Sequence, residues 1–179
     1  MVSERIQAME LWDLYNENRE LIGKTMLRGQ EVPQGLYHLS VQVWIRNSRG
    51  EYLISQRSAD RPTFPLMWEC VGGAALAGED SLTAALRETR EEVGVELEAE
   101  KGRLAYSAVG RVIDGVKIRD ILDAWIFEYD GEVDLHNATT AEVAQIKWMN
   151  CDEIQVLFEK KKFVHTLAYF FTEIKDKQI

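Results

Sequence analysis

The sequence contains few cysteines, few prolines and no long apolar run. Its two cysteines, Cys70 and Cys151, are far apart and form no CxxC pattern, which favours two free thiols in a reducing compartment over a single disulfide. The N-terminal residues lack an apolar core bounded by small residues, so they do not resemble a secretory leader. No apolar run approaches the ~18 residues that a membrane-spanning helix needs. We therefore expect a cytoplasmic protein without a membrane span.

Basic residues are scarcer than acidic ones, since 21 Lys and Arg against 30 Asp and Glu give a formal net charge of −9. This balance argues against broad binding to nucleic acid or to anionic membranes. It is compatible with a small anionic substrate, because a bound divalent metal can invert the local field. A length of 179 residues, of which 46% are hydrophobic, predicts one domain, residues 1–179, with a sizeable core.

The most informative stretch is residues 72–95, where a loop of small residues, 72–79, precedes a helix pattern over 80–93. Asp80 or Ser81 can cap the start of this helix, and Gly94 stands where a helix ends in the left-handed conformation. At about 100° per residue, two faces of the helix differ in character. The face suited to burial holds Leu82, Ala85, Leu86, Thr89 and Val93, and the acidic face holds Glu88, Glu91 and Glu92.

The acidic face allows two interpretations. On an exposed helix, like-charge pairs cost only a few tenths of a kcal/mol each, so the face could be a solvated surface. In a partly buried face, two charges about 5 Å apart repel by roughly 3 kcal/mol at an effective dielectric constant near ~20. A buried cluster would then need a cation, and oxygen ligands suit Mg²⁺, Mn²⁺ or Ca²⁺.

The full spacing of this stretch resembles the signature of the Nudix superfamily, the pyrophosphohydrolases of nucleoside diphosphates linked to another moiety. All the fixed glycine and polar positions match, namely Gly73, Glu79, Arg87, Glu88, Glu91, Glu92 and Gly94, and the apolar Val95 follows them. One departure is Thr89, which stands where the family usually has an aliphatic residue. The resemblance implies an α/β fold, the Nudix-type α/β/α sandwich with a mixed sheet, whose core covers about residues 36–160.

The resemblance also implies a metal site. Its ligands for Mg²⁺ or Mn²⁺ would be Glu88, Glu91, Glu92 and the carbonyl of Gly73. An ion pair between Arg87 and Glu79 would orient these ligands, and the same pair would stiffen the loop against the helix.

The general base and the phosphate contacts are less defined. By similarity to the family, the base would be a helix glutamate, Glu91 or Glu92, or the later acid Glu142, which could instead be a solvated loop residue. Arg57 could reach a phosphate of a small-molecule diphosphate substrate, or it could be a surface or packing arginine. We expect the choice of substrate to depend on the loops 28–36, 58–66 and 130–141.

The segment 37–47, which contains His38, resembles the corresponding strand of isopentenyl-diphosphate isomerases, a branch of the superfamily in which the matching histidine binds metal. The isomerase also needs a catalytic cysteine and a second metal-binding histidine, at positions that are Gly72 and Ala74 here. Cys70 is two residues away and lies on the same strand face, so the isomerase stays an alternative. Otherwise we expect His38 to be a hydrogen-bonded strand residue near the pocket.

The remaining chain predicts further elements. Strands are expected at 10–15, 21–27, 36–46, 51–57, 68–71, 96–109, 116–129 and 143–149, and helices at 151–159 and 163–175. Residues 1–8 read as a short lead. Residues 1–35 would form an N-terminal extension with a small β-hairpin, and residues 161–179 would carry a C-terminal helix. The hairpin could be a lid or the surface of a homodimer.

Three functions compete at this point. The first is a divalent-metal-dependent hydrolase that cleaves a diphosphate linkage. The second is the isomerase. The third is a Nudix-type module that binds a ligand without turnover, and the intact acidic face speaks against it.

Overall fold

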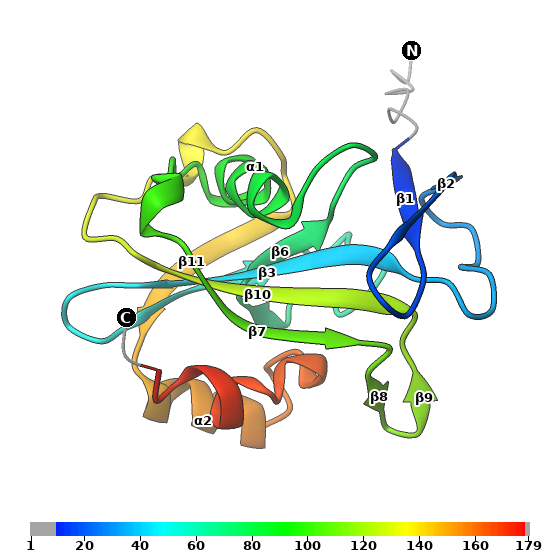
Figure 1. Ribbon diagram of the computed structural model, residues 1–179. Helices are drawn as coiled ribbons and strands as arrows, with labels where there is room; N and C mark the ends of the chain where they lie inside the picture. The colour runs from blue at the N-terminus through cyan, green and yellow to red at the C-terminus, as the bar shows by residue number, and fades with distance from the viewer. Residues whose placement is uncertain (1–9, 178–179) are drawn as a thin grey trace, which may run out of the picture.

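The structure, a computed structural model, describes residues 10–177 (Figure 1). A mixed sheet runs through the molecule in the strand order β11-β4-β3-β10-β7, with β5 beside β4 and β6 beside β3. The strands are β3 His38–Arg46, β4 Tyr52–Arg57, β5 Trp68–Glu69, β6 Val71–Ala74, β7 Arg103–Val109, β10 Asp120–Glu128 and β11 Val143–Met149. The lead expected at residues 1–8 lies outside the described residues.

The hairpin of β3 and β4 diverges soon after its turn. The two strands pair only at Arg46 and Tyr52. Beyond that point β3 pairs with β6 and, in parallel, with β10, whereas β4 pairs with β5 and β11. The strand predicted over 68–71 is therefore two short strands, because the chain changes partner from β4 to β3 around Cys70. Gly72 and Gly73 lie in β6, just before the chain enters the helix.

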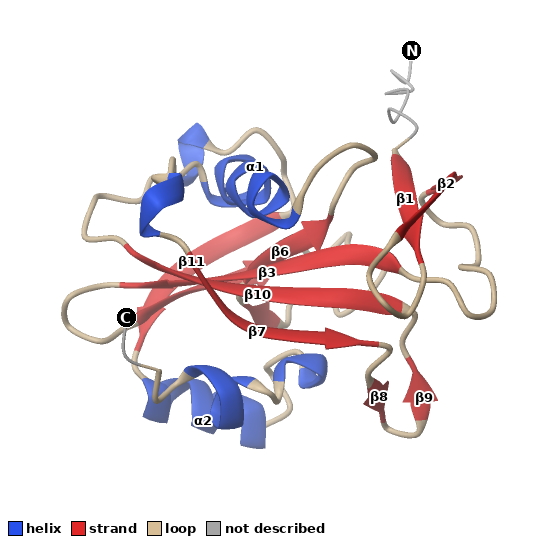
Figure 2. Ribbon diagram, viewed as in Figure 1, coloured by secondary structure: helices blue, strands red, loops and turns tan. Residues whose placement is uncertain are grey.

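Helices cover both faces of the sheet, as Figures 1 and 2 show. Helix α1, Ser81–Val93, lies over one face, and α2, Cys151–Glu159, lies over the other together with the C-terminal segment. Alternation along β3 divides the core accordingly, because successive side chains of a strand point to opposite faces. Val41 and Val43 join the core cluster under α1, whereas Trp44 joins the cluster under α2. The predicted α/β/α sandwich is confirmed.

Helix α1 forms where its sequence predicts it. The carboxylate of the N-cap residue Asp80 accepts a hydrogen bond from the backbone N–H of Thr83 at 2.8 Å, and the C-cap residue Gly94 has a φ of 70°. Thr89 is fully buried, and its hydroxyl donates to the carbonyl of Ala85 at 2.8 Å. That internal hydrogen bond explains how a threonine fills an aliphatic position of the family pattern.

The predicted N-terminal hairpin is present as β1, Leu11–Tyr15, and β2, Leu21–Leu27. Two backbone hydrogen bonds between Tyr15 and Tyr37, at 2.8 and 3.0 Å, attach it to the chain just before β3. The ring of Trp12 stacks on that of His38, with centroids 4.3 Å apart. The hairpin therefore packs against the end of the sheet.

The helix predicted over 163–175 is wrong. The segment contains a 3₁₀ turn, His165–Leu167, and a π-helical turn, Phe170–Ile174. Its start is extended, because Val164 N–H donates to the carbonyl of Trp68 and Trp68 N–H donates to that of Lys162, both at 2.9 Å. This pairing with β5 holds the chain along the sheet, so a regular helix cannot begin at residue 163.

Two predicted strands differ in their extent. The strand predicted over 96–109 begins only at Arg103, since Ala99–Lys101 is a 3₁₀ turn and the Gly102 that follows lies against the ring of Phe127. The strand predicted over 116–129 is interrupted, because β9, Val116–Lys117, pairs with β8, Val112–Ile113, in a separate small hairpin. Within the described residues, no helix combines the length and apolarity needed to span a bilayer.

Candidate active site

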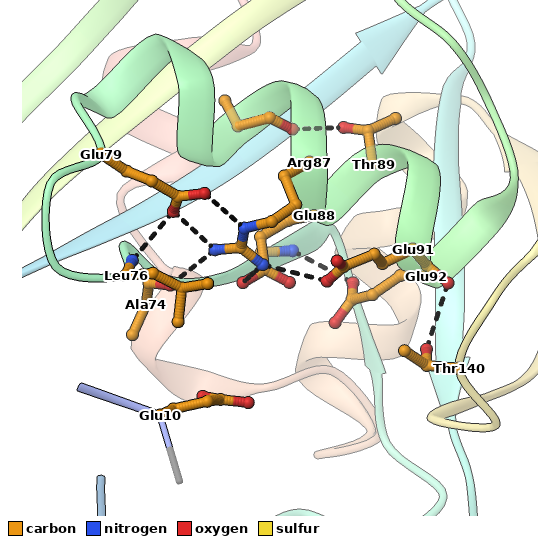
Figure 3. Close-up of polar contacts among 12 residues, drawn as sticks. Glu10, Ala74, Leu76, Glu79, Arg87, Glu88, Thr89, Glu91, Glu92 and Thr140 are labelled. Carbon is orange, nitrogen blue, oxygen red and sulfur yellow. Dashed lines mark hydrogen bonds and ion pairs between the residues drawn. The ribbon is translucent and has the colours of Figure 1, made fainter. Parts of the chain in front are cut away.

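The acidic face of α1 is turned toward the protein (Figure 3). The side chains of Glu88 and Glu91 are 13% and 31% exposed, and Glu92 is buried. The carboxylate of Glu92 accepts a hydrogen bond from the backbone N–H of Gly72 at 3.2 Å. The interpretation of this face as a solvated surface is therefore wrong.

Burial changes the acidity of these carboxyl groups. It raises the pKa of Glu88 to about 7, against the opposing effect of the Arg87 guanidinium. It also raises the pKa of Glu92 well above its usual range, and the neighbouring charges of Glu88 and Glu69 add to that increase. Ionised carboxylates in this position carry an electrostatic cost that a bound cation would reduce.

Gly73 and Glu88 approach closely. A Cβ at Gly73 would lie under 3.0 Å from three atoms of the Glu88 carboxyl group. A side chain at this position would therefore force the Glu88 carboxyl group to shift. Gly73 leaves that carboxyl group in place against β6.

The Arg87 guanidinium donates most of the side-chain hydrogen bonds at this face (Figure 3). Its guanidinium binds Glu79 through two hydrogen bonds, of 2.8 and 3.0 Å, and donates to the carbonyl of Ala74 at 3.0 Å. It also donates to Glu88 at 2.9 Å and to Glu91 at 3.0 Å. The Arg87–Glu79 pair that the sequence predicted is present, and it joins the glycine loop to the helix.

The loop before β11 brings Glu142 to the same region. The backbone N–H groups of Thr139 and Thr140 donate to the carbonyl of Glu91 at 3.0 and 3.1 Å, which anchors this loop on α1. Glu142 forms an ion pair with Arg61 at 2.6 Å. Its charge also contributes to the raised pKa values of Glu88 and Glu92. Glu142 is therefore a member of the acidic group rather than a solvated loop residue.

Arg57 lies beside the same segment, since it pairs with Val143, and it forms an ion pair with Glu69 at 2.6 Å and donates to the carbonyl of Thr63 at 2.8 Å. The sequence analysis missed both Glu69 and Arg61. Burial raises the pKa of Glu69, and its charge is one of those that raise the pKa of Glu92. The sequence could have indicated Glu69 by its position, since it is an acidic residue between Trp68 and Cys70, directly before the glycine loop.

His38 has different surroundings from those expected. Its ring lies under Trp12, and its Nδ1 is buried without a hydrogen-bond partner among the described residues, so the expected hydrogen bond is absent at this atom. Burial lowers the pKa of His38, although the nearby Asp120 opposes that shift. His38 is thus neutral at neutral pH, and its charged neighbour is Asp120 rather than the acidic face of α1.

The donor set suits a hard divalent cation, because Glu88, Glu91 and Glu92 offer carboxylate oxygens in a buried, electronegative position. Within residues 10–177, however, no three His, Cys, Asp or Glu side chains are already arranged around a common metal position. Glu88 and Glu91 are directed to Arg87, and Glu92 is directed to the Gly72 N–H. Each of these hydrogen bonds uses one carboxylate oxygen, so ligation would require the other oxygens to converge on one position.

Known proteins share both the sequence and the fold. The NUDIX domain family matches residues 36–172. A relative named an uncharacterized Nudix hydrolase of Listeria innocua is 35% identical over 164 residues, which cover 91% of each chain. The chloroplastic isopentenyl-diphosphate Delta-isomerase 1 of Cannabis sativa is 34% identical over 182 residues, which cover 89% of this chain and 61% of the isomerase.

Among solved structures, a Deinococcus radiodurans protein superposes with a TM-score of 0.71 at 24% identity, over 87% of this chain and 92% of that one. This similarity shows the fold. The family match over residues 36–172 includes the glycine loop and the acidic face of α1. The chain belongs to the Nudix hydrolase family, a membership that supports a pyrophosphohydrolase-type function with the divalent metals that this family generally uses.

Proposed function

We propose that this protein hydrolyses a diphosphate linkage in a nucleoside diphosphate derivative or a related small organic pyrophosphate, with Mg²⁺ or Mn²⁺ as the cofactor. The observation that carries the proposal is the buried acidic face of α1, with Glu88 and Glu92 held against the glycine pair 72–73. A cytoplasmic location and a small-molecule partner, with neither nucleic acid nor a membrane, belong to the same proposal.

The divalent metal, when bound, would neutralise diphosphate charge and activate water. Glu88, Glu91 and Glu92 would hold it, with the Gly73 carbonyl as a further ligand. Arg87 would keep its two hydrogen bonds to Glu79 and so fix the loop against the helix. This pair would act on the geometry of the ligands rather than on the substrate.

Two arginines supply positive charge for the phosphates. Arg57 and Arg61 are each held by one carboxylate, Glu69 and Glu142 respectively, at 2.6 Å. A phosphate that enters this region would compete with these carboxylates for the guanidinium groups, whose planar fork can bind two phosphate oxygens at once. The release of Glu142 from Arg61 would free its carboxylate to accept the proton of the attacking water, while the bridging P–O bond breaks. Glu91 and Glu92 stay alternatives for this base.

Two features favour hydrolysis over isomerisation. A Cβ at Gly72 would lie 2.5 Å from the carbonyl oxygen of Val41 and 3.1 Å from Cγ of Gln42, so the isomerase cysteine has no room there. Cys70, the other candidate, is buried in the α2-side core, and burial raises its pKa well above the usual range. It is thus a poor proton donor or acceptor for a substrate.

A substrate panel tests the proposal. The purified protein would be incubated with Mg²⁺ or Mn²⁺ and with nucleotide sugars, dinucleotides, nucleoside triphosphates or prenyl diphosphates, and the products would be identified. Metal-dependent cleavage of a diphosphate supports the hydrolase. Conversion of the prenyl group without phosphate release supports the isomerase. Tight binding without turnover supports the binding module.

The variants Glu91→Gln and Glu92→Gln test the assigned residues. Each should lower metal-dependent turnover by at least about 100-fold, since an amide is a weaker ligand and a weaker base than a carboxylate. The thermal unfolding temperature should not fall for Glu92→Gln, because the amide oxygen of glutamine can accept the same hydrogen bond from the Gly72 N–H. The matched control is Glu96→Gln, at an exposed position just beyond the helix. Full activity in both helix variants would refute the assignment.

A further inference from the structure

The N-terminal hairpin is bonded to the glycine loop of the acidic site. The backbone N–H of Ala77 donates to the carbonyl of Leu11 at 2.8 Å, and the N–H of Gly78 donates to the Asp13 carboxylate at 2.7 Å. Both contacts come from β1. The hairpin is therefore fixed beside the loop that precedes α1, although it lies outside the family domain itself.

An ion pair closes the open end of this hairpin. Arg28 follows β2, and its Nη1 donates to the carboxylate of Glu10 at 2.8 Å, while its backbone N–H donates to the Glu10 carbonyl at 2.9 Å. In the view of Figure 3, Glu10 lies below Ala74 and Leu76, and the next residue, Leu11, accepts the hydrogen bond from Ala77 of the same loop. The two side chains are 49% and 37% exposed, so a small solute can reach this ion pair.

Arg28 also lies within electrostatic reach of the acidic group. Burial lowers its pKa, but Glu10 and the charges of Glu142 and Glu88 raise it, and the net effect is an increase. Only its Nη1 and its backbone N–H have hydrogen-bond partners among the described residues. The guanidinium thus keeps donors for a second anion.

We propose that Arg28 is a specificity-determining residue that binds a phosphate of the substrate, and that Glu10 competes with this phosphate for it. The inference rests on the proposed hydrolysis of a diphosphate. Arg57 and Arg61 already lie near the acidic group, so a third arginine matters most for a substrate with a third phosphate. We therefore expect nucleoside triphosphates or other polyphosphates to depend on Arg28 more strongly than nucleotide sugars do.

The proposal predicts that substitutions of the two members of the ion pair change KM in opposite directions. If the ion pair only holds the hairpin together, Arg28→Ala and Glu10→Gln should both change KM in the same direction, because each breaks the same contact. If Arg28 binds phosphate, Arg28→Ala should raise KM about tenfold for a triphosphate, because a hydrogen bond to a charged group is lost. Glu10→Gln should instead lower KM by about two- to fivefold, because the competing charge is removed. Arg28→Lys should restore part of the loss.

The experiment measures kcat and KM for these variants with a nucleoside triphosphate and with a nucleotide sugar, whichever of them the wild type cleaves. The control pair is Arg49→Ala and Glu51→Gln, an ion pair of 2.8 Å at the turn between β3 and β4. We expect kcat to stay within about twofold in all variants, because Arg28 would bind the phosphate equally well in the ground state and in the transition state. An unchanged KM in Arg28→Ala, or shifts of the same sign in both members of the pair, would overturn the proposal.

Failure of the proposed hydrolysis is a separate outcome. If the wild type cleaves no member of the panel, calorimetry with inorganic tripolyphosphate and pyrophosphate in the presence of Mg²⁺ replaces the kinetic measurement. Arg28→Ala should then weaken tripolyphosphate binding about tenfold and pyrophosphate binding less, and Glu10→Gln should strengthen both. Equal affinities in wild type and Arg28→Ala would show that Arg28 binds no phosphate.

Discussion

Glu88 and Glu92 are the residues at which the sequence pattern and the structure agree most closely. Both were expected on one helix face, and both lie beside the glycine pair 72–73, with Glu92 buried and Glu88 13% exposed. Their environment could not be predicted from the helix alone, since the Gly72 N–H and the charge of Glu69 come from β6 and β5. The reason is that a pKa depends on burial and on charges brought close by the fold.

These two carboxyl groups predict a pH dependence of the metal-free protein. Their pKa values are raised above the unfolded values, to about 7 for Glu88, so their ionisation destabilises the folded state above that pH. The cost disappears as the pH falls toward the ordinary carboxyl pKa of about 4.3. Mg²⁺ favours the ionised form, and it should therefore raise the unfolding temperature more at about pH 8 than at about pH 6.

The measurement is a set of thermal unfolding curves at both pH values, with and without Mg²⁺. Glu88→Gln is the comparison, because it removes one of the raised groups and should reduce the difference between the two pH values. The lowered pKa of His38 acts in the opposite direction below about pH 6.5, and the comparison cancels it. Equal stabilisation by Mg²⁺ at both pH values would contradict the prediction.

At the scale of elements, a half-buried ion pair adds to the other contacts that attach the N-terminal hairpin to the sheet. Arg19, in the turn between β1 and β2, donates two hydrogen bonds to Asp123 of β10, at 2.8 and 2.7 Å, and the Asp123 side chain is 2% exposed. Burial alone would raise the pKa of Asp123, but hydrogen bonds from Arg19 and from the hydroxyl groups of Ser107 and Ser81 hold it below its usual range. The hairpin is thus fastened to the middle of the sheet.

Removal of the arginine should leave this carboxylate buried without its cation. We expect Arg19→Ala to lower the free energy of unfolding by about 2–3 kcal/mol, because the Asp123 carboxylate is buried although Arg19 itself is partly exposed. Denaturant titration measures this loss. Arg49→Ala, which breaks an exposed pair, should cost no more than about 0.5 kcal/mol. Similar losses in both variants would show that the Asp123 pair contributes no more than a surface contact.

At the scale of the whole molecule, stability is divided between the two cores on either side of the sheet. The C-terminal segment completes the core under α2, where the Phe170 ring lies 4.5 Å from that of Trp44 and 5.1 Å from that of Tyr52, centroid to centroid. Phe170 is fully buried, although it belongs to a turn rather than to the predicted helix. The segment is therefore part of the fold.

Truncation of that side chain tests the contribution of the segment. Phe170→Ala should lower the free energy of unfolding by about 3–5 kcal/mol, because it leaves a cavity between Trp44 and Tyr52. Denaturant titration gives the value, and Val156→Ala, at an exposed position of α2, is the control and should cost less than about 0.5 kcal/mol. A loss below about 1 kcal/mol for Phe170→Ala would mean that the segment packs only loosely.

Local patterns in the sequence determined α1 with its caps, the N-terminal hairpin and most strands of the sheet, because periodicity and turn residues act over a few positions. They also determined which glutamates share a helix face. Only the tertiary structure decided that Glu69, Arg61 and Glu142 join them, that Arg28 lies within electrostatic reach of them, and that residues 162–164 pair with β5 instead of starting a helix. These outcomes depend on contacts between segments distant in the chain, and burial and charge at such contacts exist only once the sheet has formed.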